Sequence, residues 1–380
     1  MSLFAVFRGL LEKEPFLSFM KYAEAEGESE KRKCYGAFVE KIYGGGGDLT
    51  AMARRTLFED ENVYVRAIGR GETVKGAVLA AVHSELLTLG AFAGLSPSDF
   101  LSELGECALP RFDSKEADFV TEYAERVKKI DKYGYGIFAS NVMFSVGEGG
   151  EILPSASPDE TSLSDFIGYK TERAKVIDNT KAFLEGRPGA NILLYGDAGT
   201  GKSSTVKAVV NHFFEQGLRL IEVRKNQLLL LPKVMGQISK NPLRFIIFID
   251  DLSFLQNDDS FSMLKAILEG SASARAKNAL IYATSNRRHI VKETFSDREG
   301  DDLHRNDSVQ ETLSLSERFG LTILFAKPEK KVYLEIVHEL AARYGIEIPA
   351  AELDVKAEAF ALKRGYRSAR CAEQFIDSLL

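Results

Sequence analysis

GDAGTGKS occupies residues 196–203, directly after the apolar run NILLY (191–195) and before SSTVKAVVNHFFEQG (203–217). The pattern G-x-x-x-x-G-K-[ST] between an expected strand and an expected helix is typical of a phosphate-binding loop. Its glycines let backbone N–H groups turn inward around phosphate oxygens, and the start of the helix adds partial positive charge. The residues expected to contact a nucleotide are Gly196, Asp197, Ala198, Gly199, Thr200, Gly201, Lys202, Ser203 and Ser204.

Two residues of this loop and one residue outside it have distinct predicted roles. Lys202 is expected to reach the β- and γ-phosphates of the nucleotide, and Ser203 to give its hydroxyl oxygen to Mg²⁺. The stretch FIIFIDDLSF (245–254) carries an apolar run that ends in two aspartates. Asp250 stands where a neighbouring parallel strand would end, at the sheet edge where ligands collect, and is predicted to hold Mg²⁺.

Asp251 and Asn286 are candidates for handling the attacking water. A carboxylate near the γ-phosphate can polarise water, although capping of the following helix would also explain Asp251. Asn286 ends ATSN (283–286), where an amide can position water or touch the γ-phosphate. Strands also end in Ser-Asn for reasons of turn geometry, so the tetrapeptide alone decides nothing.

Two arginines in the last quarter of the chain are further candidates. Arg318 in SERFG can project from a subunit edge into a neighbour's nucleotide, where an arginine finger raises the rate by orders of magnitude. The alternative for Arg318 is a surface salt bridge with Glu317 or Glu311. Arg370 in RSARCAEQF begins the last expected helix and can fold back over the phosphates, with Arg367 as the competing residue.

Apolar runs alternate with helical segments after residue 190. Five of these runs are expected to be buried strands, at 191–195, 218–223, 244–250, 279–286 and 321–326. Strands separated by helices predict a parallel sheet that is covered on both faces, so the expected fold class is α/β.

The regions on either side of this alternation are expected to be helical. LAAVHSELLTLGAF (79–92) and ADFVTEYAERVKKI (117–130) carry apolar residues at helical spacing. Glycine, proline and serine cluster at 146–162, which predicts a linker. From Pro328 onward the pattern is helical again.

The composition is that of an ordinary globular protein, with 45% hydrophobic and 27% charged residues. No uninterrupted apolar run approaches the roughly 18 residues of a membrane span, and the N-terminus does not resemble a secretory signal, so we expect a cytoplasmic protein. Cys34, Cys107 and Cys371 lie far apart and suggest neither a zinc site nor a disulfide framework. The net charge of −6 argues against a whole-surface nucleic-acid binder, while a local basic groove stays open.

Taken in order, GDAGTGKS, FIIFID, ATSN, SERFG and the late SAR helix resemble the motif set of the AAA+ ATPases. The closer resemblance is to a bacterial AAA+ family of unknown function, through stretches such as IGYKTER, GTGKSSTVKA, YATSNRRH and RSARCAEQFID. This resemblance covers about residues 160–380 and, more loosely, the N-terminal region.

The resemblance implies a P-loop NTPase core of αβα type with a parallel five-stranded sheet and a small C-terminal helical lid. The implied division is a mostly helical N-terminal region (1–145), the AAA+ nucleotide-binding core (160–326) and the lid (327–380). ATP would be bound where the core, the lid and a neighbouring subunit meet.

The resemblance also assigns individual residues. It implies that Ile167 and Gly168 lie near the adenine and that Asn286 is the sensor 1 residue. Arg318 is then the finger, and Arg370 is the sensor 2 residue that reports on the nucleotide.

Residue 251 departs from the family pattern, because most hydrolysing AAA+ proteins have Glu at this position. The Asp251 side chain is shorter by one C–C bond, about 1.5 Å. A misplacement of about 1 Å can cost roughly 100-fold in rate. Either the backbone lies closer and Asp251 still serves, or hydrolysis is slow and the protein is mainly a nucleotide-gated switch.

Three functions are therefore under consideration. The leading hypothesis is an ATPase that uses Mg²⁺, hydrolyses ATP to ADP and phosphate, and remodels or loads an unidentified macromolecular partner, as a homo-oligomer joined through Arg318. The second is a binding module in which ATP controls assembly with little hydrolysis. The third is a DNA-associated loader, suggested by the basic stretches RRH (287–289) and KRGYRSAR (363–370) and opposed by the acidic net charge. No membrane partner is expected.

Overall fold

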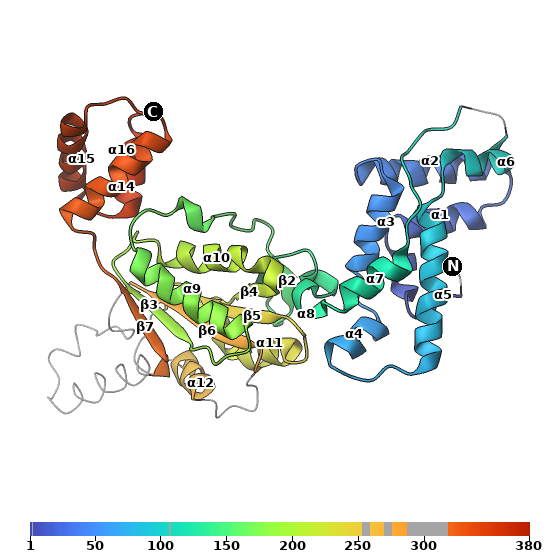
Figure 1. Cartoon of the computed structure of the whole chain (residues 1–380), viewed down its shortest axis with the longest axis horizontal. Helices are drawn as coiled ribbons and strands as arrows, with labels where there is room; N and C mark the ends of the chain where they lie inside the picture. Colours follow the sequence, from blue (N-terminus) through green and yellow to red (C-terminus); the bar gives the residue numbers. More distant parts are fainter. Residues whose placement is uncertain (2, 106–107, 253–258, 270–275, 287–317) are drawn as a thin grey trace. The chain divides into compact units, whose positions relative to one another are not determined.

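The computed structural model describes residues 1–380 except for 2, 106–107, 253–258, 270–275 and 287–317 (Figure 1). The chain divides into two compact units. The first comprises residues 1–140 with 240–243, and the second comprises 141–239 with 244–380. Each unit is built around buried apolar clusters of its own.

The second unit contains a seven-stranded sheet with the order β2-β1-β4-β5-β6-β3-β7. All neighbouring strands are parallel except β1 and β2, which form an antiparallel pair at one edge. The strands are β1 (Met143–Val146), β2 (Ile152–Pro154), β3 (Ile192–Gly196), β4 (Leu218–Glu222), β5 (Arg244–Ile249), β6 (Ala279–Ser285) and β7 (Leu321–Phe325). This mostly parallel sheet confirms the predicted α/β class and the five predicted strands.

The expectation of a five-stranded sheet, and of a linker at 146–162, needs correction at one edge. β1 and β2 lie in and beside that stretch, and β1 extends the parallel sheet by pairing with β4. Both strands are short, with only four and three residues, so the surrounding Gly, Pro and Ser outweigh them in any pattern. Pairing with β4, which is distant in sequence, is what makes β1 a strand.

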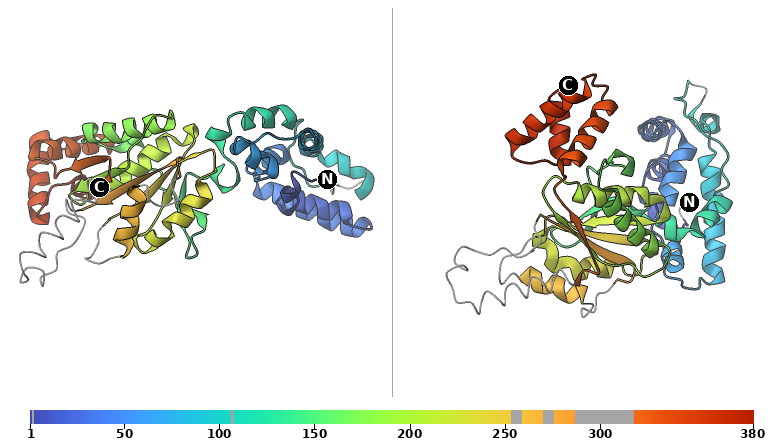
Figure 2. Two further views of the ribbon diagram at one scale, coloured as in Figure 1. Left: turned by 90° about the horizontal axis from the view of Figure 1, so that it is seen from below. Right: turned by 60° about the vertical axis from the view of Figure 1, so that its left-hand side comes forward.

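Helices cover both faces of the sheet. Figure 2 shows α9 and α10 on one face and α11 and α12 on the other. The helical segments of this layer are η4 (Leu163–Asp165), α9 (Lys170–Leu184), α10 (Lys202–His212), η5 (Phe214–Gln216), η6 (Lys225–Leu230), α11 (Leu231–Ile238) and α12 (Asp259–Leu268). Apolar side chains of α9 and α10, among them Val176 and Val209, pack with Ile246 and Phe248 of β5, so the sheet is buried from this side.

Three helices at the C-terminus form a small bundle, which we call the lid: α14 (Lys330–Arg343), α15 (Ala350–Arg364) and α16 (Ala369–Asp377) (Figure 1). The lid has its own buried apolar cluster, which includes Tyr333, Leu353 and Phe375. The Tyr333 hydroxyl donates to the carbonyl oxygen of Ala357 (3.1 Å), which ties α14 to α15.

The regular elements in the described residues of the first unit are all helices, as predicted for a mostly helical N-terminal region, and an isolated bridge joins Asp48 to Asp113. Its elements are η1 (Arg8–Glu12), α1 (Phe16–Glu24), α2 (Glu28–Gly44), α3 (Leu49–Phe58), α4 (Val63–Gly69), α5 (Gly76–Ala93), η2 (Pro97–Phe100), α6 (Leu101–Leu104), α7 (Phe119–Val127), α8 (Ile130–Tyr133) and η3 (Gly136–Phe138).

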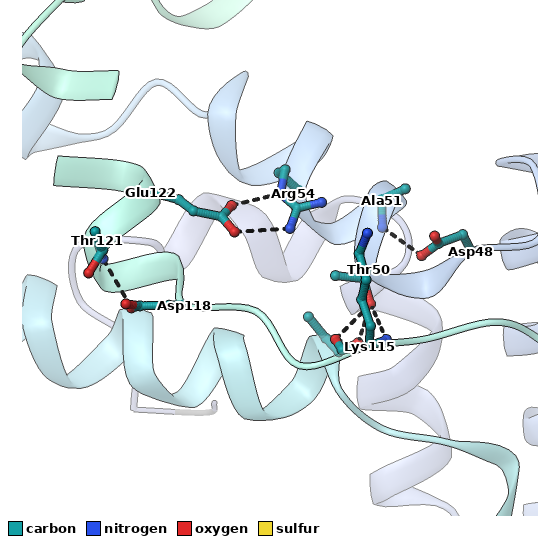
Figure 3. Close-up of polar contacts among 9 residues, drawn as sticks. Asp48, Thr50, Ala51, Arg54, Lys115, Asp118, Thr121 and Glu122 are labelled. Atoms are coloured by element: carbon teal, nitrogen blue, oxygen red, sulfur yellow. Dashed lines mark hydrogen bonds and ion pairs between the residues drawn. The ribbon is translucent and has the colours of Figure 1, made fainter. Parts of the chain in front are cut away.

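Polar contacts fasten α3 to its neighbours in this unit (Figure 3). Arg54 of α3 forms a bidentate ion pair with Glu122 of α7, in which its Nε and Nη2 atoms donate to the two carboxylate oxygens at 2.7 and 3.0 Å. The Thr50 hydroxyl accepts the backbone N–H of Lys115 (2.9 Å) and lies 2.9 Å from the carbonyl oxygen of Ala93. These bonds satisfy polar groups that the packing of α3 against α5 and α7 would otherwise bury unpaired.

Helix α5 is the only element among the described residues with the length and apolar character of a membrane-spanning helix, and 33% of it is buried. Core helices of globular proteins meet the same criterion. Glu85 lies in the middle of α5 with a side chain only 7% exposed. Its carboxylate accepts the backbone N–H groups of Ala5, Val6 and Phe7 at 2.8–3.2 Å. Glu85 therefore anchors the N-terminal segment on α5.

We expect Glu85→Ala to destabilise the protein by about 2–4 kcal/mol, because it leaves buried N–H groups without an acceptor. Urea unfolding followed by circular dichroism measures this loss. Glu40→Ala, an exposed glutamate of α2, is the matched control and should cost less than about 0.5 kcal/mol. Equal costs for the two variants would contradict the anchoring role of Glu85.

Candidate functional site

The parallel strands β3, β5 and β6 all end on the same side of the sheet, where the loops that follow them meet. The register pairs Leu194 with Thr284 and Ile249 with Ala283, so the residues that follow these three strands come out level with one another. They include the loop at 196–203, the two aspartates at 250–251, and Asn286. One expectation needs correction: β5 is not adjacent to β3, because β6 lies between them.

The glycines at 196 and 199 allow two close approaches to the loop. A Cβ atom on Gly196 would lie 2.1 Å from the carbonyl oxygen of Phe325 on β7. A Cβ atom on Gly199 would lie 3.1 Å from the Ser368 hydroxyl of the lid. Both residues also have positive φ angles, 137° and 75°, which favour glycine. The backbone of the loop is therefore shaped by β7 on one side and by the lid on the other.

Lys202 is the first residue of α10 and is 5% exposed. Its ammonium group donates to the carbonyl oxygens of Gly196 (3.0 Å) and Asp197 (2.7 Å) and to Oδ1 of Asn286 (3.0 Å). Burial lowers the pKa of Lys202, and the nearby carboxylates of Asp197, Asp250 and Asp251 oppose that shift. Lys202 thus stands beneath the loop with an acceptor for each of its three N–H bonds.

Ser203 and Asp250 meet across the site. The Ser203 hydroxyl donates to Oδ1 of Asp250 at 2.6 Å. A hydroxyl and a carboxylate supply the hard oxygen ligands that Mg²⁺ prefers, and Mg²⁺ commonly takes only one or two protein ligands beside water and substrate phosphates. No cluster of three or more His, Cys, Asp or Glu side chains exists in the described part of the chain to serve as a complete metal cage. The pair therefore suits a Mg²⁺ that arrives with a nucleotide.

Asp251 has a left-handed backbone with a φ angle of 52°. Its N–H donates to the Thr284 hydroxyl (2.9 Å) and to Oδ1 of Asp250 (3.1 Å). Its carboxylate accepts the side-chain N–H of Asn286 at 2.9 Å. Since Asn286 also accepts from Lys202, its amide bridges the lysine and the second aspartate.

The sequence did not identify Thr284, although its hydroxyl bonds both aspartates. Thr284 is two residues before Asn286, and residues i and i+2 of a strand point to the same face of a sheet. That alternation is the signal in ATSN from which Thr284 could have been found together with Asn286.

A pocket lies beside the loop, between η4, the start of α9, and helices α14 and α16 of the lid. Its apolar wall includes Phe166, Ile167, Ile336 and Leu340, and Arg370 and Ser204 add polar groups.

Gly168 directly follows the pocket residue Ile167 in the chain, and a buried arginine holds its carbonyl group. Arg173, 7% exposed, donates to the carbonyl oxygen of Gly168. The same guanidinium lies 5.0 Å from the ring centroid of Phe166. Burial lowers the pKa of Arg173. Arg173 was not identified from the sequence, and no motif there marks it.

The two candidate arginines of the lid occupy different surroundings. Arg370 lines the pocket, and its backbone N–H donates to the carbonyl oxygen of Gly199 at 3.3 Å. Arg367 forms a bidentate ion pair with Glu358, with N–O distances of 2.7 and 2.9 Å. Of the two, Arg370 is therefore the residue next to the loop.

Arg318 does not lie beside the loop of its own chain. It lines a second pocket with Asn191, Ala279 and Gly320, which stand where β3, β6 and β7 begin. Arg318 is therefore at the amino-terminal ends of the parallel strands, and the loop 196–203 is at their carboxyl-terminal ends. Its guanidinium forms an ion pair with Glu269.

Several sequence-based alternatives lie outside the described residues. They are Glu311 and Glu317, which were considered as partners of Arg318, and the basic stretch 287–289. The described ion pair of Arg318, with Glu269, was not anticipated.

A family model described as "Protein of unknown function (DUF815)" matches residues 139–380. No similarity to a curated protein sequence was found. Among solved structures, one titled "Thermotoga maritima RuvB Holliday junction branch migration motor" is similar, at 16% identity. The match covers 57% of this chain and 72% of that chain with a TM-score of 0.35, a likeness too small to say what this chain binds.

We expect Gly196→Ala to destabilise the second unit by about 2 kcal/mol or more, because its methyl group would collide with the backbone of β7. Differential scanning calorimetry measures the change. Gly236→Ala in α11 is the control: a Cβ there meets nothing within 4 Å, and the change should be neutral or stabilise by up to about 1 kcal/mol. An unchanged melting temperature for Gly196→Ala would contradict the close approach.

Proposed function

The chain belongs to the DUF815 family, and we propose that it is an AAA+-type ATPase that binds Mg·ATP at the loop 196–203. The observation that carries the proposal is the meeting of Lys202, Ser203 and Asp250 at one sheet edge, with the Ser203 hydroxyl 2.6 Å from the Asp250 carboxylate. The strand–loop–helix order of β3, the loop and α10 supports a phosphate site at that edge.

The loop is proposed to hold the phosphates through its backbone. Backbone N–H groups of residues 196–204 and the N-terminus of α10 supply partial positive charge, and Lys202 supplies a full one. In the structure the Lys202 ammonium donates to the carbonyl oxygens of Gly196 and Asp197. The phosphate oxygens of a nucleotide would compete for the same N–H groups, and they carry more negative charge than a carbonyl oxygen does.

Ser203 and Asp250 would hold the Mg²⁺ that accompanies the nucleotide. When bound, that ion supplies neutralisation of the negative charge on the β- and γ-phosphate oxygens. Hydrogen bonds keep these ligands in place. The Ser203 hydroxyl donates to the Asp250 carboxylate, and the Thr284 hydroxyl donates to the same carboxylate oxygen.

Hydrolysis is assigned to Asp251 and Asn286. Asp251 accepts a proton from water while the water oxygen bonds to the γ-phosphorus, and the bond to the β–γ bridging oxygen breaks to give ADP and phosphate. Asn286 lies 2.9 Å from the Asp251 carboxylate and 3.0 Å from the Lys202 ammonium, a place from which its amide can orient that water.

The adenosine would occupy the pocket beside the loop. Ile167 lines this pocket opposite Ile336 and Leu340 of the lid, and Gly168 follows directly in the chain. Apolar walls suit an adenine ring. Arg370, which enters from α16, is proposed as the lid residue that responds to the phosphates.

Arg318 is proposed to act on the nucleotide of a second copy of the chain. It lies at the edge of the sheet opposite its own loop, so it cannot complete the site of its own chain. A homo-oligomer in which this edge meets a neighbour's loop would bring the arginine to the phosphates.

Residues 160–326 act as the nucleotide-binding core and 327–380 as the lid, while the helical region 1–145 selects a macromolecular partner to be remodelled or loaded. A DNA partner is not favoured, because the net charge is −6 and the arginine at 367 is paired with Glu358.

The test uses two variants at neutral pH. Lys202→Ala should weaken Mg·ATP binding by about 100-fold or more in calorimetry, because the charge at the phosphates is lost. Asp251→Asn should leave the affinity within about threefold and lower phosphate release by roughly 100-fold or more. Lys207→Ala in the same helix and Asp178→Asn on α9 are the matched controls. Full ATP affinity in Lys202→Ala would reject the site, and full turnover in Asp251→Asn would reject the base.

A second function, a nucleotide-gated switch, is favoured by one observation: the short Asp251 carboxylate is bonded to Asn286. If that bond persists with ATP bound, the protein would bind and change state with little hydrolysis. Phosphate release and gel-filtration size should be measured together, with and without Mg·ATP. Assembly that depends on ATP, with release no faster than in Asp251→Asn, would establish the switch and contradict the ATPase.

A further inference from the structure

Thr284 is a buried polar residue whose hydroxyl contacts both aspartates of the proposed site, Asp250 through its carboxylate and Asp251 through its backbone N–H. It is the sixth residue of β6, and its side chain is 2% exposed. The hydroxyl donates to Oδ1 of Asp250 and accepts the backbone N–H of Asp251 at 2.9 Å. A hydroxyl has one proton to give, so its orientation is fixed by Asp250 and its lone pair is left for Asp251.

The main chain of Thr284 holds the next residue. Its carbonyl oxygen accepts the N–H of Leu252 at 2.7 Å. Two successive N–H groups after β5, those of Asp251 and Leu252, thus both bond to Thr284, one to its side chain and one to its backbone. Thr284 of β6 therefore fixes the backbone of the two residues, Asp251 and Leu252, that come shortly after β5.

These bonds explain the unusual backbone of Asp251. Its φ angle of 52° lies in the left-handed region, which aspartate tolerates better than most residues but seldom adopts without support. The φ angle sets the direction of the Asp251 side chain relative to the backbone N–H that Thr284 holds. With the hydroxyl in place, the carboxylate of Asp251 is directed to the side-chain N–H of Asn286 at 2.9 Å.

We propose that Thr284 is a positioning residue for ATP hydrolysis, whose hydroxyl holds Asp251 in the left-handed conformation that lets a short carboxylate reach the γ-phosphate side of the site. This inference rests on the proposed function and adds to it the device that compensates for Asp in place of Glu. The same hydroxyl also donates to Oδ1 of Asp250, but that oxygen accepts from the Ser203 hydroxyl and the Asp251 N–H as well, so Asp250 keeps two donors without Thr284.

Another buried threonine of the same unit, Thr180, has a hydroxyl that contacts neither aspartate. Thr180 of α9 is fully buried, and its hydroxyl donates to the carbonyl oxygen of Val176 (2.8 Å) and lies 2.8 Å from the hydroxyl of Tyr282. Its bonds serve packing between a helix and the sheet. Thr180 is therefore a matched control for the general effect of removing a buried threonine hydroxyl.

The experiment compares Thr284→Val with Thr284→Ser and Thr180→Val in ATP turnover at saturating Mg²⁺. Valine keeps the shape and the strand preference of threonine and removes both hydrogen bonds. We expect Thr284→Val to lower kcat by roughly 10- to 100-fold while KM for ATP changes less than about threefold, because the base is misplaced and the phosphate loop is intact. Thr284→Ser keeps the hydroxyl and should stay within about threefold of the wild type, as should Thr180→Val.

A double variant separates positioning from a general loss of structure. If Thr284 acts through Asp251, adding Thr284→Val to Asp251→Asn should lower the residual turnover by less than about twofold. An equal fold-loss in the Asp251→Asn background and in the wild type would overturn the inference. Full turnover in folded Thr284→Val would overturn it too, and would leave the proposed ATPase standing.

Two outcomes remain. If Thr284→Val fails to fold, Thr284→Ser decides: a folded serine variant with less than about a tenth of wild-type turnover would overturn the role of the hydroxyl, and full turnover would support it. If the wild-type protein itself shows no turnover, the proposed hydrolysis and the inference both fall.

Discussion

The hydrogen bond from the Ser203 hydroxyl to the Asp250 carboxylate joins the two parts on which the proposed site depends. Ser203 belongs to the helix that follows β3, and Asp250 follows β5, with β6 lying between these strands. The bond can form because parallel strands end at a common edge and because the register brings Ile249 level with Ala283. The pairing of the sheet, rather than any local pattern, therefore sets the distance between the hydroxyl and the carboxylate.

A continuous chain of hydrogen bonds extends from this pair. It runs from Ser203 through Asp250 and Thr284 to Asp251, and from there through Asn286 to Lys202. Burying the Lys202 ammonium without partners would cost several kcal/mol, so each of its donors has an acceptor. In a network of this kind a change at one member shifts the others. The arrival of a phosphate at Lys202 would release Asn286, and through it the carboxylate of Asp251.

The lid is the part of the site with the least direct attachment to the sheet. It has its own apolar cluster, and it approaches the loop where Gly199 has no side chain. The backbone N–H of Arg370 bonds the carbonyl oxygen of that glycine. A nucleotide in the adjoining pocket would therefore contact the loop and the lid at the same time. In the proposed complex, the phosphates could therefore affect the position of the lid.

The sequence by itself determined the α/β class, the five parallel strands and the position of the loop 196–203 between a strand and a helix, since glycine spacing and apolar runs are local patterns. It missed β1 and β2, which are too short to stand out, and it placed β5 beside β3. Only the tertiary structure showed Thr284 beneath both aspartates, Arg370 rather than Arg367 at the loop, and Glu269 as the partner of Arg318. These facts depend on strand order, register and helix docking, which bring together residues tens of positions apart and leave no periodic trace in the chain.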